Sequence, residues 1–197
     1  MVDISKKKIT TRVAKAEGYI YMNRATLEMI EKGLHKKGDV LSIARLAGIM
    51  GAKKTSDLIP LCHPLSIEGI NIDFQINNKS NSIKVLVDCK TTNKTGIEIE
   101  ALTAVSICTL TIYDMCKSVD RGMIIDKISL IHKSGGKSGT FNKKKVLLGV
   151  NNRNLKNMAV DINHALNVVK KNNKNYIICE SGIKSFEQYQ NLISQGF

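Results

Sequence analysis

The stretch Pro60-Leu61-Cys62-His63-Pro64 contains both prolines of the chain, with a histidine between them. Proline fixes its own φ and drives the preceding residue toward extended backbone, so this loop is stiff around His63. A histidine held on a stiff loop can transfer protons near neutral pH. The competing interpretation is a structural turn. Cys62 has no cysteine partner at zinc-site spacing, so we expect no metal site here.

A second set of candidate groups lies on residues 97–119, which form one mostly apolar stretch that predicts a long helix. Glu98 and Glu100 fall near its start, and Asp114 and Lys117 near its end. Asp114 and Lys117 are three residues apart and therefore neighbours on a helix surface, where an ordinary ion pair is one interpretation. Acidic groups in such apolar surroundings are usually paired or functional, which favours a role in a site.

The spacing of these groups predicts a shared site. Glu100 and Asp114 are separated by about four helical turns, so they lie within about 40° of each other around the axis but about 21 Å apart along it. One compact pocket cannot use both ends of a straight helix. If both residues belong to one kind of site, a second subunit completes it, and the protein is an obligate oligomer.

The segment Ser134-Gly135-Gly136-Lys137-Ser138-Gly139 is rich in glycine and follows a predicted strand. It is not a P-loop, because Ile131 stands where that pattern requires glycine. Its backbone N–H groups, with Lys133 and Lys137, are able to hold phosphates, and a solvated turn is the equal alternative. Lys37 and Lys53 flank a predicted helix and, taken singly, are typical solvated lysines.

Hydrophobic periodicity predicts the elements that position these groups. Apolar residues alternate over 70–76 and 83–89, which indicates a hairpin, and further strands are expected at 13–22 and 123–132. Helical spacing predicts helices at 24–33, 39–52 and 97–119. This order is typical of an α+β fold with a mostly antiparallel sheet and helices on one face. The sequence pattern changes after the lysine run at 143–145, so we expect domains at 1–142 and 143–197.

Composition limits the classes of function. The net charge is +13, with +7 on residues 1–142 and +6 on the rest, which favours a polyanionic ligand or only a lysine-rich surface. There is no tryptophan and no RNP-like or zinc-finger pattern, so we do not expect nucleic-acid binding. No run of 18 apolar residues and no signal peptide is present, and the five cysteines are scattered. We expect a cytoplasmic protein with no membrane contact.

Together these segments resemble the MoaC family, the cyclic pyranopterin monophosphate synthases. The resemblance covers residues 1–142 and is carried by ordered matches at 1–5 (MVDIS), 37–40 (KGDV), 44–50 (ARLAGIM), 58–65 (LIPLCHPL), 95–103 (TGIEIEALT), 113–117 (YDMCK) and 133–139 (KSGGKSG).

The resemblance implies a ferredoxin-like α+β fold, assembled as a hexamer of dimers with sites between subunits. It implies an enzyme of molybdenum cofactor biosynthesis, a lyase that converts 3′,8-cyclo-7,8-dihydro-GTP into cyclic pyranopterin monophosphate and releases pyrophosphate. By the same resemblance Asp114 is the catalytic acid or base, and Lys117 and Lys37 are essential lysines. The residues expected to contact substrate are Leu61, Cys62, His63, Ile99 and Glu100, with Arg12, Lys53, Glu98 and Lys133 as further pocket members.

The implied chemistry suits these residue types. Opening and reclosing the purine requires several proton transfers, which Asp114, His63 and a lysine of lowered pKa can share. Closing the cyclic phosphate requires cations that neutralise the developing charge. No redox cofactor is needed. Magnesium can accompany the triphosphate, but we see no carboxylate cluster dedicated to a metal.

Residues 147–197 resemble a different family, indole-3-glycerol-phosphate synthase, in its late βα units. The matches are 148–155 (LGVNNRNL) and 179–183 (CESGI), which imply a barrel-mouth position for Asn151, Glu180 and Ser181. A whole barrel of this kind needs about 250 residues, so the segment is an incomplete fragment and we expect no indole synthesis. A gene-fusion remnant, a chimera and a truncated partner domain all fit the sequence.

Two alternatives to the pterin-forming lyase stay open. In the first, the appended fragment has cost the chain its activity and left a non-catalytic scaffold, which a turnover assay would reveal. Nucleic-acid binding, suggested by the basic charge, predicts steeply salt-sensitive binding to DNA or RNA.

Overall fold

The computed structural model describes residues 1–143, 147–151, 159, 161, 176–180, 183 and 185–194. The chain divides into two compact units, Met1–Lys143 and Lys144–Phe197. Each is described by itself.

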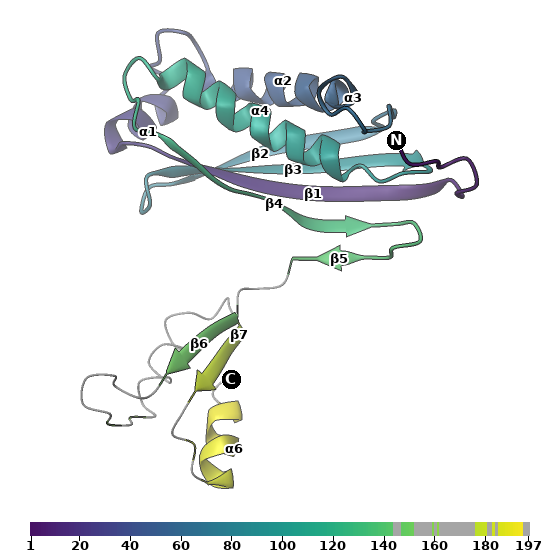
Figure 1. The fold of residues 1–197 in the computed structure, drawn as a ribbon. Helices are drawn as coiled ribbons and strands as arrows, with labels where there is room; N and C mark the ends of the chain where they lie inside the picture. Colours follow the sequence, from purple (N-terminus) through teal and green to yellow (C-terminus); the bar gives the residue numbers. More distant parts are fainter. Residues whose placement is uncertain are drawn as a thin grey trace. The chain divides into compact units, whose positions relative to one another are not determined.

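The first unit is built on a five-stranded sheet in the order β2-β3-β1-β4-β5, with every neighbouring pair antiparallel (Figure 1). The strands are β1 (Thr10–Tyr21), β2 (Gly69–Asn77), β3 (Ser82–Asn93), β4 (Ile124–Ser134) and β5 (Phe141–Asn142). The predicted hairpin is β2–β3, in which Ile72 pairs with Val87. The alternating apolar residues therefore place one face of each strand in the core, as their period of two requires.

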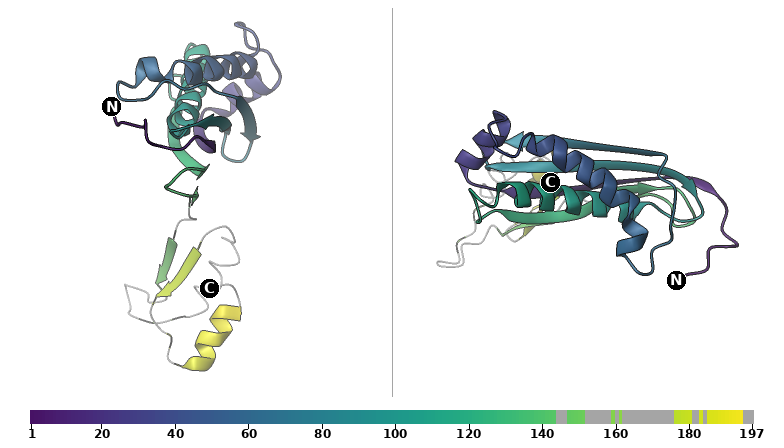
Figure 2. Two further views of the ribbon diagram at one scale, coloured as in Figure 1. Left: turned by 90° about the vertical axis from the view of Figure 1, so that its right-hand side faces the viewer. Right: turned by 90° about the horizontal axis from the view of Figure 1, so that it is seen from above.

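Four helices accompany the sheet: α1 (Arg24–Glu31), α2 (Val40–Lys53), α3 (Thr55–Leu58) and α4 (Glu98–Cys116). The helices lie over one face of the sheet, with α2 and α4 side by side (Figures 1 and 2). Fully buried residues of β1, such as Ala14 and Ile20, meet the buried side of α4, which includes Val105 and Ile112. The ferredoxin-like α+β fold expected from the sequence is confirmed.

The crossing of α2 and α4 depends on small residues. A Cβ at Gly48 would lie 2.3 Å from Cys108 Sγ and 2.9 Å from Ile72 Cδ1, distances at which atoms overlap. Glycine therefore lets the two helix backbones approach closely over the sheet.

Two local features accompany the helices. Asn23 is the N-cap residue of α1, but its side chain makes no cap hydrogen bond. Instead the buried carboxylate of Asp120 accepts hydrogen bonds from the Asn23 backbone N–H at 2.7 Å and from the Thr26 hydroxyl at 3.3 Å. The segment between α2 and the stiff loop at 60–64 forms the one-turn helix α3.

Helix α4 is long and apolar enough to cross a membrane, judged by length and composition alone. Its first turn nevertheless carries the charged residues Glu98 and Glu100. Half of this stretch is buried inside the domain. Its apolar composition is therefore explained by packing against the sheet and α2.

The second unit contains two parallel strands, β6 (Leu147–Asn151) and β7 (Tyr176–Glu180), and helix α6 (Phe186–Ser194). Asn151 and Glu180 are register partners at the carboxyl ends of the two strands, as a pair of βα units requires. Ser181 and the helix expected between the strands lie outside the described residues.

Candidate active site

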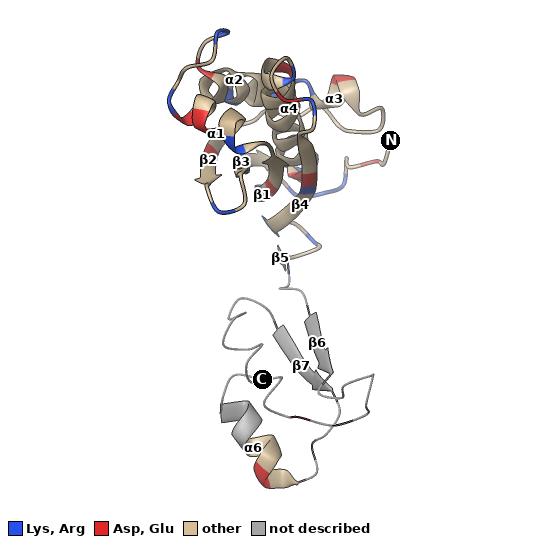
Figure 3. Ribbon diagram, turned by 90° about the vertical axis from the view of Figure 1, so that its left-hand side faces the viewer, with Lys and Arg blue, Asp and Glu red and all other residues tan. Residues whose placement is uncertain are grey.

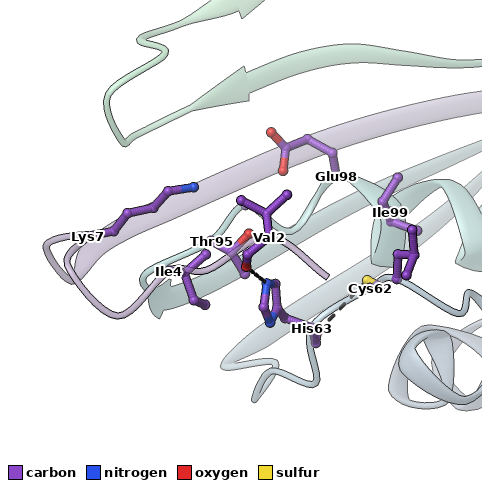
Figure 4. Close-up of a pocket in the computed structure, with 10 residues that line it drawn as sticks. Val2, Ile4, Lys7, Cys62, His63, Thr95, Glu98 and Ile99 are labelled. Atoms are coloured by element: carbon purple, nitrogen blue, oxygen red, sulfur yellow. Dashed lines mark hydrogen bonds between the residues drawn. The ribbon is translucent and has the colours of Figure 1, made fainter.

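The candidate site begins with a pocket of about 480 Å³ at the N-terminal end of α4. Figure 4 shows that the stiff loop after α3, the first turn of α4 and the N-terminal segment surround it. Of the predicted substrate-contacting residues, Leu61, Cys62, His63, Glu98 and Ile99 line it. The sequence did not single out the other lining residues, which are Val2, Ile4, Lys7, Thr95 and Gly96.

His63 is fixed by a main-chain contact. Its Nε2 lies 2.7 Å from the carbonyl oxygen of Val2. Because a carbonyl only accepts hydrogen bonds, Nε2 must be the donor, which leaves Nδ1 as the nitrogen available to exchange a proton. The same N-terminal segment is held a second time, because Lys94 Nζ donates to the Ser5 carbonyl at 2.9 Å.

Glu100, which was also predicted to contact substrate, is not among the residues that line this pocket and is only 3% exposed. Burial raises its carboxyl pKa, and the negative charge of Glu98 adds to this, while hydrogen bonds from its own backbone N–H and from Cys62 oppose it. The Cys62 thiol lies 3.7 Å from Glu100 Oε1, and burial followed by the nearby carboxylate raises the pKa of that thiol. A buried carboxyl group for which the described residues supply no cationic partner is shifted toward its neutral form.

A second group of predicted residues lies at the other end of α4. Lys117 Nζ is 2.6 Å from Asp114 Oδ1, and Lys37 Nζ is 3.5 Å from the Asp114 carbonyl oxygen. The hydrogen bond and charge of Lys117 lower the carboxyl pKa of Asp114, and the same contact raises the Lys117 pKa. Both side chains are largely exposed, so this pair contributes little to stability but keeps both groups ionised.

The structure therefore separates the candidate site into two halves within one chain. We call them the loop half (Leu61–His63 with Glu98–Glu100) and the lysine half (Lys37, Asp114 and Lys117). One unbroken helix carries Glu100 and Asp114, so at 1.5 Å per residue they are about 21 Å apart along its axis. The charged residues of α4 lie only near its two ends, and the helix between them is uncharged. Figure 3 marks the Lys and Arg positions of the domain in blue and the Asp and Glu positions in red.

The remaining predicted residues lie apart from these halves. Arg12 lines a second pocket of about 540 Å³, together with Lys137 and Gly136 of the glycine-rich loop. The Lys133 ammonium donates to the Ser138 hydroxyl of the same loop. Lys53 ends α2 on the exposed surface and lines neither pocket.

Among the described residues, no group of three His, Cys, Asp or Glu side chains is placed to hold a metal ion. Burial raises the pKa of Cys89 and of Cys108 to about 12, so these two thiols stay protonated. Cys62 lines the pocket at the N-terminal end of α4.

Two solved structures match this chain only weakly. A ferredoxin protease, FusC, in complex with Arabidopsis ferredoxin is 12% identical with a TM-score of 0.28, over 55% of this chain and 10% of its own. AtUAH in complex with (S)-hydroxyglycine is 9% identical with a TM-score of 0.29, over 89% of this chain and 36% of its own.

The sequence comparisons are specific. A cyclic pyranopterin monophosphate synthase from Peptoclostridium acidaminophilum is 53% identical over 146 residues, which are 74% of this chain and 92% of the relative. Residues 140–197 match the family model of indole-3-glycerol phosphate synthase. Residues 1–136 match the model of the MoaC family, and with this match and the relative, the chain belongs to the MoaC family.

Proposed function

We propose that the protein is a cyclic pyranopterin monophosphate synthase of molybdenum cofactor biosynthesis. It converts 3′,8-cyclo-7,8-dihydro-GTP into cyclic pyranopterin monophosphate and pyrophosphate. The observation that carries this proposal is the 53% identity to a relative of that name over most of both chains. The loop half and the lysine half supply the acids, bases and cations that this reaction needs.

The protonation states favour a division of labour in the proton transfers. The ion pair keeps Asp114 in the charge state of a base and Lys117 in the charge state of an acid. Because the pair lowers the pKa of Asp114 and raises the pKa of Lys117, both groups become stronger in these roles only when the substrate separates them. His63 offers Nδ1 to the pocket while Nε2 is bound to the main chain. Opening and reclosing the purine ring needs donors and acceptors of both kinds, and general acid–base groups of this type each contribute about 10²–10⁴-fold in rate.

Formation of the cyclic phosphate is a displacement at phosphorus. A ribose-derived hydroxyl attacks the α-phosphate, the bond to the β-phosphate breaks, and pyrophosphate leaves with the electron pair. The charge that develops on the phosphoryl oxygens is stabilised best by fixed cations, for which Lys37, Lys117 and Arg12 are the candidates, with Lys133 nearby. Magnesium bound to the triphosphate would arrive with the substrate.

A second subunit completes the site in this proposal, because the two halves are too far apart on α4 to meet around one nucleotide. In a symmetric dimer, the loop half of one copy can face the lysine half of the other, and the reverse contact forms at the same interface. A hexamer of dimers, which the family resemblance implies, is compatible with this arrangement.

The test is turnover by the full chain. Purified protein is incubated with 3′,8-cyclo-7,8-dihydro-GTP, and pyrophosphate release and the cyclic product are followed. Lys37→Ala should lower the rate at least about 100-fold, whereas Lys36→Ala, the same change at an exposed neighbour, should leave it unchanged. A folded wild-type chain that releases no pyrophosphate would show that the chain is a non-catalytic scaffold.

A further inference from the structure

The lysine half is built from two different parts of the chain. Asp114 lies in the last turn of α4 and Lys117 is the C-cap residue of the same helix, so the helix itself fixes their spacing. Lys37 comes from the segment between α1 and α2, 77 residues before Asp114, and its Nζ lies 3.5 Å from the Asp114 carbonyl oxygen. The position of the Lys37 charge relative to the other two groups therefore depends on how that segment is held.

Both ends of this segment are fixed by helix caps. After α1, Gly33 has φ of +65°, and the N–H groups of Gly33 and Leu34 donate back to carbonyl oxygens of the last helical turn, which is the Schellman motif. Before α2, the Asp39 carboxylate accepts two backbone N–H groups of the first turn at 3.0 Å. The freedom that is left lies between these two caps, where Lys37 stands.

His35 anchors the middle of the segment. It is buried, at 8% exposure, whereas every other residue from 31 to 39 is exposed, including Leu34 at 69%. An ordinary loop would bury the leucine in preference to the histidine, because an aliphatic side chain gains more by leaving water. The reversed order indicates that the polar atoms of the imidazole hold the loop.

Two hydrogen bonds of His35 enclose Lys37. The Nδ1 atom of His35 accepts the Lys37 backbone N–H at 3.1 Å, and its carbonyl oxygen accepts the Gly38 N–H at 3.0 Å. Because a backbone N–H only donates, Nδ1 carries no proton and the ring proton is on Nε2. The side chain thus bonds the main chain two residues ahead, as Asn and Asp do in Asx turns, and Lys37 occupies the third position of a tight turn over 35–38.

We propose that His35 is a positioning residue, which fixes the direction in which Lys37 leaves the main chain toward Asp114. The inference rests on the proposed function, because it names what holds one cation of that site in place. The lysine side chain is a flexible four-carbon stem, so it cannot correct its own position if the backbone that carries it moves. A displacement of about 1 Å at a catalytic group costs up to about 100-fold in rate, so the His35 turn controls a large part of what Lys37 contributes.

The test compares His35→Leu with His35→Asn in turnover of 3′,8-cyclo-7,8-dihydro-GTP by the full chain. Leucine and asparagine have nearly the same shape, so both leave similar space where the ring was, but only asparagine has an oxygen that accepts the Lys37 N–H. His35→Leu should lower kcat by about 10- to 100-fold with KM within about threefold, because the lysine charge acts chiefly in the transition state. His35→Asn should restore kcat to within about threefold of wild type, since it rebuilds the same turn. His35→Ala, which has no acceptor and cannot clash, should behave as His35→Leu does.

A double variant separates positioning of Lys37 from a general structural effect. If His35 acts through Lys37, adding His35→Leu to Lys37→Ala should cause no further loss of kcat, because the group that is positioned is already absent. A general loosening of the fold would instead multiply the two losses.

The hydrogen bond itself is followed by amide hydrogen exchange at Lys37, which does not need turnover. Exchange should be faster in His35→Leu than in the wild type and should return toward the wild-type rate in His35→Asn. Wild-type kcat in His35→Leu, equal losses of kcat in the leucine and asparagine variants, or multiplied losses in the double variant would overturn the proposal. An inactive wild-type chain in which exchange at Lys37 still follows this order would refute the proposed function alone and leave the anchoring role of His35 in place.

Discussion

Two inactive variants of this protein should restore activity to each other when they are mixed. His63→Ala damages the loop half, and Asp114→Asn damages the lysine half, which lies about 21 Å away along α4. If each working site takes one half from each chain of a symmetric dimer, a mixed dimer has one intact site and one site with both defects. At equal amounts about half of the dimers are mixed, so about a quarter of wild-type activity should return.

The assay is pyrophosphate release after the two variants are unfolded and refolded together, or produced together with different affinity tags and purified as the mixed species. Each variant alone should be at least about 100-fold below wild type. Purified mixed species should reach about half of wild-type activity, since one of the two sites in each dimer is intact.

The matched control uses two defects in the same half. Asp114→Asn mixed with Lys117→Ala should stay inactive, because no combination of these chains contains an intact lysine half. Activity of the His63→Ala and Asp114→Asn mixture that does not rise above the sum of the two variants would refute the shared site. Such a result would mean that both halves act within one chain, although α4 holds them far apart.

Three further changes test the fold and the buried acid. Gly48→Ala should destabilise the domain by about 1–3 kcal/mol in urea unfolding, because overlap at the α2–α4 crossing exceeds the helix-propensity gain of about 1 kcal/mol; Gly69→Ala, where a Cβ meets its nearest atom at 3.9 Å, should stay within about 0.5 kcal/mol. Asp120→Ala should cost about 1–3 kcal/mol by leaving the first turn of α1 without its acceptor, and a smaller loss than about 0.5 kcal/mol would show that water replaces it. The folded-state pKa of Glu100 lies above its ordinary 4.5, so the wild type loses stability as pH rises from 4.5 through that higher value. Glu100→Gln lacks this loss and should therefore melt higher than the wild type at pH 7, with the difference vanishing below pH 4.5; an equal difference at both pH values would contradict a raised pKa.

The regular elements could be predicted from the sequence because each buries one apolar face. The alternation at 70–76 and 83–89 predicted a hairpin that the structure extends to Gly69–Asn77 and Ser82–Asn93. The long apolar stretch predicted α4, and helix geometry alone then separated Glu100 from Asp114. The predicted end at residue 119 was three residues too far, since the chain turns after Cys116, whose carbonyl accepts from the Val119 and Asp120 N–H groups.

The features that could not be predicted depend on contacts between distant residues. The N-terminal segment has no periodicity, yet Val2, Ile4 and Lys7 form one wall of the loop-half pocket. The acceptor at the start of α1 comes from Asp120, 97 residues after Asn23. Periodic patterns report local structure, so they contain no information on such pairs.

The contact between His63 and the Val2 carbonyl has a consequence for how this site tolerates sequence change. Because the acceptor is the peptide backbone, replacing the side chain at position 2 leaves it in place. A point substitution at position 2 therefore does not change the tautomer of the His63 imidazole. Alanine scanning of the N-terminal segment would for this reason miss the effect of that segment on the histidine. Only removing these residues, or displacing their path by altering Lys94, would release the ring.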